Sequence, residues 1–129
     1  MPILDHVTLV VSDFERSKAF YEKALAPLGI EIIMNFGQAC GFGIGKPDFW
    51  IGTGPASFQK PEQLRIITPT HIAFAASNRA AVDAFYQAAL AAGGKDFGAP
   101  GVRAHYHPNY YGAFVLDPDG HDIEAVFHG

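Results

Sequence analysis

The strongest constraint on the fold is an internal repeat in the 129-residue sequence. The segment from His6 to Gly29 aligns without a gap with the segment from His71 to Gly94, at a constant offset of 65 residues. The shared residues include the opening histidine, a serine, a central Phe-Tyr pair and the closing glycine. Self-similarity at a fixed period indicates a repeated structural unit. Because twice the offset is about the whole chain, we predict two copies of one module.

Each module opens with a strand, predicted over residues 6–11 and 71–75. The first segment is β-branched, and the second has its larger apolar residues at alternate positions, both typical of strands. His6 and His71 therefore lie on one face of their strands, and the bulky apolar side chains lie on the other.

A helix is predicted after each opening strand. Apolar side chains recur at helical spacing in both segments, including Phe20 and Phe85, which we expect to pack against a sheet. Helix N-cap residues precede both segments: Ser12, Asp13, Ser77 and Asn78. Gly29 and Gly94 are expected to end the helices in the left-handed conformation that glycine adopts easily.

The rest of each module reads as three short strands separated by glycine and proline turns. The predicted strands cover residues 30–36, 39–45, 48–53, 95–99, 112–116 and 122–127. The fold class is therefore α+β with two βαβββ modules in a single domain, residues 1–129. Module 1 covers about 1–54, module 2 about 70–129, and residues 55–69 form a linker. Residues 98–111 are predicted to be an irregular region.

Composition excludes several functional classes. The net charge is −4 and the nine Lys and Arg residues are scattered, so we expect no nucleic-acid partner. No apolar run approaches the roughly 18 residues that span a bilayer, so no membrane association is expected. No secretory leader is apparent, and Cys40 is the only cysteine, which fits a reducing compartment. A cytoplasmic location is the expectation.

The repeat also indicates a metal site. If the modules pair about a pseudo-twofold axis, His6 and His71 point toward each other from equivalent strands. Glu124 alternates with apolar residues on the last predicted strand, where an ionised carboxylate is costly unless it is paired or binds a metal. Two histidines and one carboxylate suit divalent Zn, Fe, Mn or Ni and leave positions open for a reactant.

The sequence resembles the vicinal oxygen chelate superfamily, which includes glyoxalases, bleomycin resistance proteins and extradiol dioxygenases. The resemblance covers the whole chain and rests on residues 4–11, 19–21, 70–74 and 117–124. It implies an open, cupped, eight-stranded barrel-like sheet with the helices outside. It also implies one divalent metal ion that binds vicinal oxygens of a small-molecule substrate, with His6, His71 and Glu124 as its ligands.

One position departs from the glyoxalase I pattern. Those enzymes add a fourth ligand, a glutamate on the last strand of the first module, and Trp50 stands at the matching position here. Glyoxalase I activity is therefore not expected. Three ligands are similar to the pattern of extradiol dioxygenases and of fosfomycin-modifying thiol transferases, which also resemble this chain at Thr8. The reaction stays open among dioxygenase, thiol-transfer and isomerase or lyase types.

Other residues are candidates for the remaining roles. The resemblance to dioxygenases, which use a nearby His and Tyr, suggests proton-transfer groups in the irregular region: His105, Tyr106 and Tyr110. The candidate substrate-binding residues are Thr8, Trp50, Arg103 and Tyr111. The alternative function is a metal-free, ligand-sequestering protein of the bleomycin-resistance type. In either case a homodimer is expected, because the fold exposes strand edges and apolar surface.

Overall fold

The computed structural model describes residues 3–54, 57–64, 67 and 69–129. The first module contains β1 (Val7–Val10), α1 (Phe14–Leu25), the 3-10 turn η1 (Ala26–Leu28), β2 (Glu31–Asn35), β3 (Ala39–Gly43) and β4 (Pro47–Gly52). The second contains β5 (His71–Ala75), α2 (Arg79–Ala91), β6 (Lys95–Val102), β7 (Tyr110–Leu116) and β8 (Asp122–His128). A short 3-10 helix, η2 (Pro61–Leu64), lies between the modules.

The two modules have the same topology. Strand order is β1-β4-β3-β2 in one sheet (sheet A) and β5-β8-β7-β6 in the other (sheet B). In each sheet the opening strand pairs with the last strand in parallel, and the remaining pairs are antiparallel. The predicted α+β class and βαβββ repeat are confirmed. The eight strands form two four-stranded sheets rather than one closed barrel, so the cup is open and β1 and β5 are edge strands.

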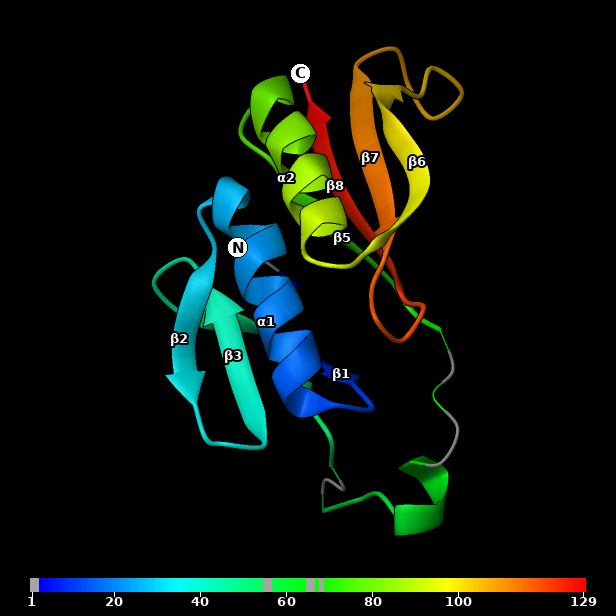
Figure 1. Ribbon diagram of the computed structural model, residues 1–129. Coiled ribbons are helices and arrows are strands. Elements are labelled where there is room, and N and C mark those ends of the chain that lie inside the picture. Colours follow the sequence, from blue (N-terminus) through cyan, green and yellow to red (C-terminus); the bar gives the residue numbers. More distant parts are fainter. Residues whose placement is uncertain (1–2, 55–56, 65–66, 68) are drawn as a thin grey trace.

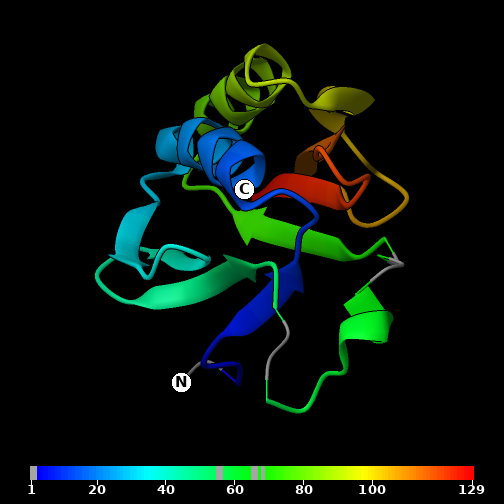
Figure 2. The ribbon, with the colours of Figure 1, turned by 60° about the horizontal axis from the view of Figure 1, so that its bottom comes forward.

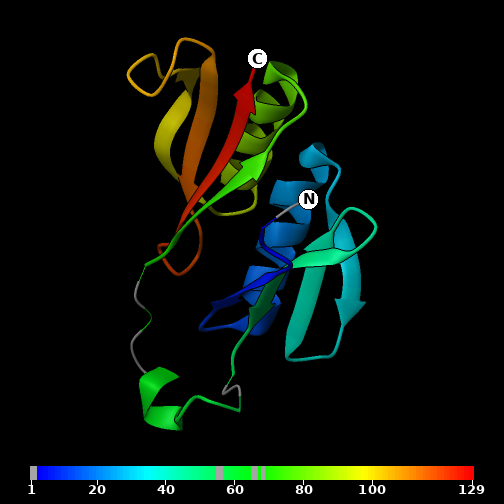
Figure 3. The same cartoon turned by 180° about the vertical axis from the view of Figure 1, so that it is seen from behind.

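Both helices lie on the same side of the sheets, which Figure 1 and Figure 3 show from opposite directions. The core between the layers contains the buried aromatic residues of both helices, so the predicted helix-to-sheet packing is confirmed. Its largest buried side chains include Tyr21, Phe20, Phe42, Phe85, Leu25, Ile51 and Ile123. An edge-to-face contact between Phe49 and Phe74, with ring centroids 5.1 Å apart, joins the two modules.

The predicted helix N-caps are confirmed at Asp13 and Asn78. Each side chain accepts a hydrogen bond from the backbone N–H three residues later, at 3.0 and 2.7 Å respectively. Gly29 is left-handed (φ 78°), as predicted. The prediction for Gly94 is wrong, because the left-handed residue after α2 is Gly93 (φ 102°). Gly94 instead packs closely, and an added Cβ there would lie 2.5 Å from a side chain of β7.

The region predicted to be irregular, residues 98–111, is shorter in the structure. β6 continues to Val102 and β7 begins at Tyr110, so only residues 103–109 connect them as a loop. The register shifts around Gly98 and Gly101, where bulges accommodate Pro100 within the ladder. These bulges bring glycine-rich backbone into sheet B, where the sequence pattern indicated only a weak strand.

The 3-10 helix η2 lies apart from the two sheets, in the region of the chain between the modules (Figure 2). Gln59 and Gln63 from this segment line a cavity of about 390 Å³ together with Thr8 and His71. Among the described residues, no helix has the length and apolar character needed to cross a bilayer.

Candidate metal centre

Glu124 is a buried carboxylate at the centre of sheet B. On β8 its neighbours Ile123 and Ala125 are fully buried in the core, so Glu124 points to the opposite face, away from the helices. Only 2% of its side chain is exposed. Ala73 on β5 and Phe114 on β7 are its register partners and share that face. A carboxylate buried to this extent needs compensating partners.

His71 provides the first of those partners. Its Nε2 lies 3.2 Å from Oε1 of Glu124, and its Nδ1 lies 2.8 Å from Oδ2 of Asp122. A neutral imidazole carries one N–H, so it can donate to only one of the two carboxylates. The arrangement therefore calls for added positive charge, either a second ring proton or a cation between Nε2 and Oε1. Two ligands that lie about 2.1 Å from one ion are themselves roughly 3.0–3.4 Å apart, so the pair fits a metal.

Asp122 was not predicted as part of the site. It orients His71, because an Nδ1–H donated to Asp122 leaves the Nε2 lone pair facing Glu124, as in carboxylate–histidine–metal arrangements. Its other oxygen, Oδ1, is buried and has no hydrogen-bond partner among the described residues. The period of two along β8, which puts Asp122 on the same face as Glu124, is a signal that could have identified it.

Tyr110 is the second partner of Glu124. Its hydroxyl donates a hydrogen bond to Oε2 of the carboxylate. Burial raises the pKa of Tyr110 well above its usual value, and the hydrogen bond to Glu124 raises it further. The phenol therefore keeps its proton at neutral pH and acts as a hydrogen-bond donor to Glu124.

His6 lies near this group without completing it. Its Nδ1 is 2.7 Å from Oδ1 of Asp5, and this hydrogen bond, together with the charge of Lys46, lowers the pKa of Asp5. His6 and His71 line the same cavity, of about 440 Å³. The ligand atoms of His6, His71 and Glu124 do not all come within 4.8 Å of one another in the described chain.

Trp50 stands where sheet B has Glu124. In register, Trp50 is opposite Thr8 and Glu124 is opposite Ala73, and the repeat makes Thr8 and Ala73 equivalent. The indole stacks on Phe36, with ring centroids 5.9 Å apart and an interplanar angle of 9°. The first module thus has an aromatic surface at the position where a second carboxylate would lie. Thr8 lines the same cavity as Trp50.

The candidate proton-transfer residues form a row of rings. The ring centroids of His105 and Tyr106 are 4.1 Å apart, and those of Tyr106 and Tyr110 are 4.7 Å apart. Tyr106 is 57% exposed, whereas Tyr110 contacts Glu124 directly. The row therefore leads from the buried carboxylate to solvent.

The two remaining candidates lie on opposite faces of sheet B. Arg103 places its guanidinium over the ring of Phe114, 5.5 Å from the centroid, on the face of Glu124. Tyr111 lies on the helix side, where its hydroxyl donates to Asp83 and the guanidinium of Arg79 stacks on its ring. Tyr111 is therefore turned away from the other site residues.

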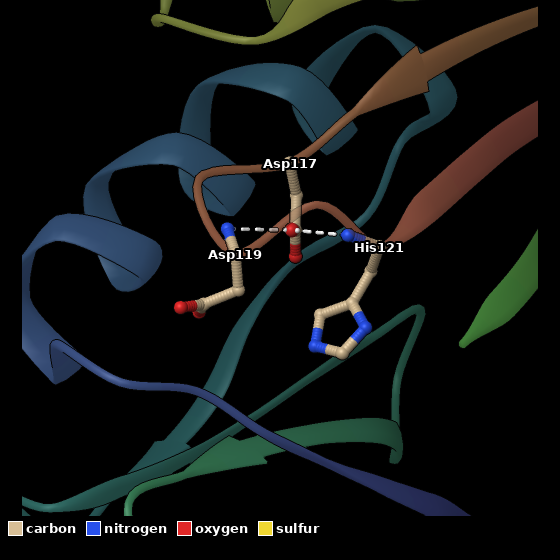
Figure 4. Close-up of side chains that lie close together, drawn as sticks. All are labelled: Asp117, Asp119 and His121. Carbon is tan, nitrogen blue, oxygen red and sulfur yellow. Dashed lines mark hydrogen bonds between the residues drawn. The ribbon is translucent and has the colours of Figure 1, made fainter. Parts of the chain in front are cut away.

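A second group of potential ligands lies in the turn between β7 and β8. Atoms of Asp117, Asp119 and His121 are within 4.8 Å of one another (Figure 4). Asp117 Oδ1 accepts the backbone N–H groups of Asp119 and His121, at 2.9 Å each. The Nδ1 of His121 accepts the N–H of Thr70 (2.9 Å), and its Nε2–H donates to the carbonyl of Val10 (3.2 Å). Both ring nitrogens are thus engaged with the backbone.

This turn joins the two modules. The buried hydroxyl of Tyr21 donates to Asp117, and the backbone N–H and hydroxyl of Ser12 donate to Asp119. Arg16 lies 3.5 Å from Asp119. His121 was not among the predicted site residues. Its Nε2–H links the modules through the carbonyl of Val10, 111 positions away, a contact that local sequence patterns do not reveal.

Comparisons with known proteins identify the family and support the fold. Residues 3–125 match the model of the Glyoxalase/Bleomycin resistance protein/Dioxygenase superfamily. A solved glyoxalase/bleomycin resistance protein from Albidiferax ferrireducens is 30% identical, with a TM-score of 0.79 over 99% of this chain and 100% of its own. No match was found among curated proteins.

Two further solved structures share the fold at lower identity. A family enzyme from Burkholderia phytofirmans is 20% identical (TM-score 0.71; 97% of this chain and 98% of that one). A lactoylglutathione lyase from Agrobacterium tumefaciens is 19% identical (TM-score 0.70; 98% and 92%). With two βαβββ modules and a family match over nearly its full length, the chain belongs to the glyoxalase/bleomycin resistance protein/dioxygenase superfamily.

Proposed function

We propose that this protein is a metal-dependent enzyme that acts on a small molecule through two neighbouring oxygens. His71, Glu124 and His6 hold one divalent ion, either Zn, Fe, Mn or Ni. The observation that carries the proposal is the 3.2 Å approach of His71 Nε2 to Glu124, with Nδ1 already taken by Asp122. When bound, the ion supplies a Lewis acid that polarises the substrate oxygens and stabilises negative charge on them.

Other side chains of the site have the remaining roles. Tyr110 keeps its proton and donates its one O–H to Glu124, which holds the carboxylate in place. Trp50 and Phe36 form an apolar wall that excludes water from the substrate. Because Trp50 replaces the fourth carboxylate, glyoxalase I isomerisation is not proposed. Dioxygenase, thiol-transfer and lyase chemistry all suit three ligands with open positions.

Metal content tests this proposal. We expect one ion per chain in the wild-type protein, lost on His71→Ala or Glu124→Ala and weakened on His6→Ala. His107→Ala is the control, because the His107 ring contacts His128 and Tyr110 and is not one of the proposed ligands. The proposal is wrong if wild-type protein binds none of the four metals stoichiometrically, or if Glu124→Ala binds them as well as wild type does.

We propose further that the protein is a cytoplasmic homodimer. The edge strands β1 and β5 are available for pairing, and large apolar side chains such as Ile44 are exposed. Light scattering after gel filtration measures the mass. Mixing His6→Ala with His71→Ala protein then assigns the ligands. Partial recovery of metal binding means that the two histidines of one site come from different chains.

The second candidate is a metal-free binding protein. The parallel stacking of Trp50 on Phe36 favours it, because such a pair can receive a flat apolar ligand. This function would require full ligand affinity in protein stripped of metal and in Glu124→Ala. The crowding of carboxylates around His71 favours the metalloenzyme instead.

A further inference from the structure

Arg103 is held at the rim of the candidate metal centre. It directly follows β6, and its backbone N–H donates to the carbonyl of Tyr110 at 2.7 Å. This bond continues the β6–β7 ladder beyond the pair Val102–Tyr111. Cross-strand neighbours share a face, so the side chain of Arg103 lies on the same face as Tyr110.

The guanidinium occupies space that is open because Gly98 and Gly101 have no side chains. Nη2 donates to the carbonyl of Ala99 at 2.6 Å, and the plane lies over Phe114. A Cβ added at Gly98 would lie 3.2 Å from Nη2, and one added at Gly101 would lie 3.2 Å from Nη1. Among the described residues, chain neighbours aside, Nη1 is the one atom that the carbon added at Gly101 would meet within 4 Å. The side chain thus has a defined place on the sheet.

The charge of this guanidinium is not neutralised by the protein. Within the described part of the chain, Arg103 forms no ion pair with a carboxylate, and its side chain donates to one carbonyl only. A guanidinium has five N–H donors in a planar fork that matches a carboxylate or phosphate. The guanidinium lies on the same face of sheet B as Glu124, because Phe114, over which it lies, is the register partner of Glu124.

Arg79 shows the contrasting, structural use of a stacked arginine. Its guanidinium lies 4.9 Å from the ring centroid of Tyr111, on the helix side of the same sheet. There the hydroxyl of Tyr111 is bound to Asp83, and the group faces the protein's own helix. Arg103 also lies over an aromatic ring, 5.5 Å from its centroid, but faces the open side of the sheet.

Phe114 connects the guanidinium to the metal ligands. Its ring centroid is 6.2 Å from that of His71 and 5.5 Å from Cζ of Arg103. One small molecule can therefore reach both groups across a single aromatic ring. We propose that Arg103 is an anion-binding subsite, so that the substrate carries a carboxylate or similar compact anion in addition to its two chelating oxygens. Only the part of this inference that concerns the two chelating oxygens rests on the proposed metal function.

A matched pair of probes tests the subsite in zinc-loaded protein. Catechol offers two vicinal oxygens, and 3,4-dihydroxybenzoate adds a carboxylate to the same group. By calorimetry we expect wild type to bind the carboxylate compound about tenfold more tightly than catechol. Arg103→Gln should lose this preference and keep both its zinc and its affinity for catechol, while Arg79→Gln keeps the preference. An unchanged preference in Arg103→Gln overturns the proposal.

A metal-free experiment separates this proposal from the metal function. In NMR spectra of ¹⁵N-labelled protein without metal, benzoate should shift the Arg103 Nε–H and the backbone N–H signals of Gly98 and Gly101. Benzamide, which lacks the charge, should not shift them, and neither should benzoate in Arg103→Gln. If the benzoate shifts are absent from wild type, the subsite is wrong even when zinc binds. If the benzoate shifts are present but the same protein fails to bind any of the four metals when they are added, the anion subsite is supported and the proposed metal function is wrong.

Discussion

Removing one hydroxyl should loosen the contact between the modules. Tyr21 is fully buried, and its hydroxyl donates to the carboxylate of Asp117, which is only 5% exposed. Tyr21→Phe keeps the ring and so creates no large cavity, but the carboxylate loses a partner. Hydrogen bonds to charged groups contribute about 1.5–3 kcal/mol. With an unfolding entropy of about 2.1 cal/mol/K per residue, that loss lowers Tm by roughly 6 to 11 °C for a chain of this length.

Differential scanning calorimetry of metal-free protein at pH 7 measures this shift. Tyr86→Phe is the matched control, because Tyr86 is the repeat equivalent of Tyr21 but its hydroxyl bonds to the exposed Asp96. We expect the control to lose less than about 1 kcal/mol. The reasoning fails if Tyr21→Phe shifts Tm no more than Tyr86→Phe does.

The thermal stability above pH 10 gives a second measurement of the hydrogen bond between Tyr21 and Asp117. Burial raises the pKa of Tyr21, and the charge of Asp117 raises it further. A folded-state pKa above the unfolded value of about 10 gives stability that is present below pH 10 and is lost as pH rises above it. The Tm difference between wild type and Tyr21→Phe should therefore shrink above pH 10. A constant difference would contradict the assignment.

Three further outcomes are expected. Gly94→Ala should cost about 1–3 kcal/mol in urea unfolding through overpacking, whereas Gly52→Ala, with no heavy atom closer than 3.4 Å, should cost much less; equal losses would refute this. Burial raises the pKa of Cys40 to about 11, so iodoacetamide at pH 8.5 should label native protein far more slowly than urea-unfolded protein, and equal rates would exclude the buried thiol. Tyr110→Phe removes a donor from Glu124 and should destabilise metal-free protein by about 1–3 kcal/mol, so unchanged urea unfolding would argue against that bond.

The repeat predicted most of the fold because both copies carry the same local signals. The helices could be predicted because each has a polar N-cap residue, Asp13 or Asn78, followed by apolar residues at regular spacing. The face on which Glu124 lies could be predicted from the alternation of residues along β8. The error at Gly94 arose because two consecutive glycines follow α2. Local sequence does not say which of them takes positive φ, and packing against β7 decides it.

The parts of the site that were missed depend on contacts between distant strands. Asp122 meets His71 only because β5 pairs with β8 in parallel, across about fifty residues of chain. His121 binds Val10 from the other module, and Phe114 lies between His71 and Arg103 through pairing of β7 with both neighbours. Such pairings follow from the assembled sheet, and one sequence without relatives contains no direct record of them.

Trp50 in sheet A and Glu124 in sheet B occupy equivalent register positions, and this difference affects how such a protein can diversify. The two copies of the repeat present different groups at this position: sheet B has a buried carboxylate beside His71, and sheet A has an aromatic surface. Substitutions around Trp50 would change the shape and polarity of that surface without altering the contact between His71 and Glu124. One module can vary in this way while the carboxylate–histidine pair of the other stays as it is.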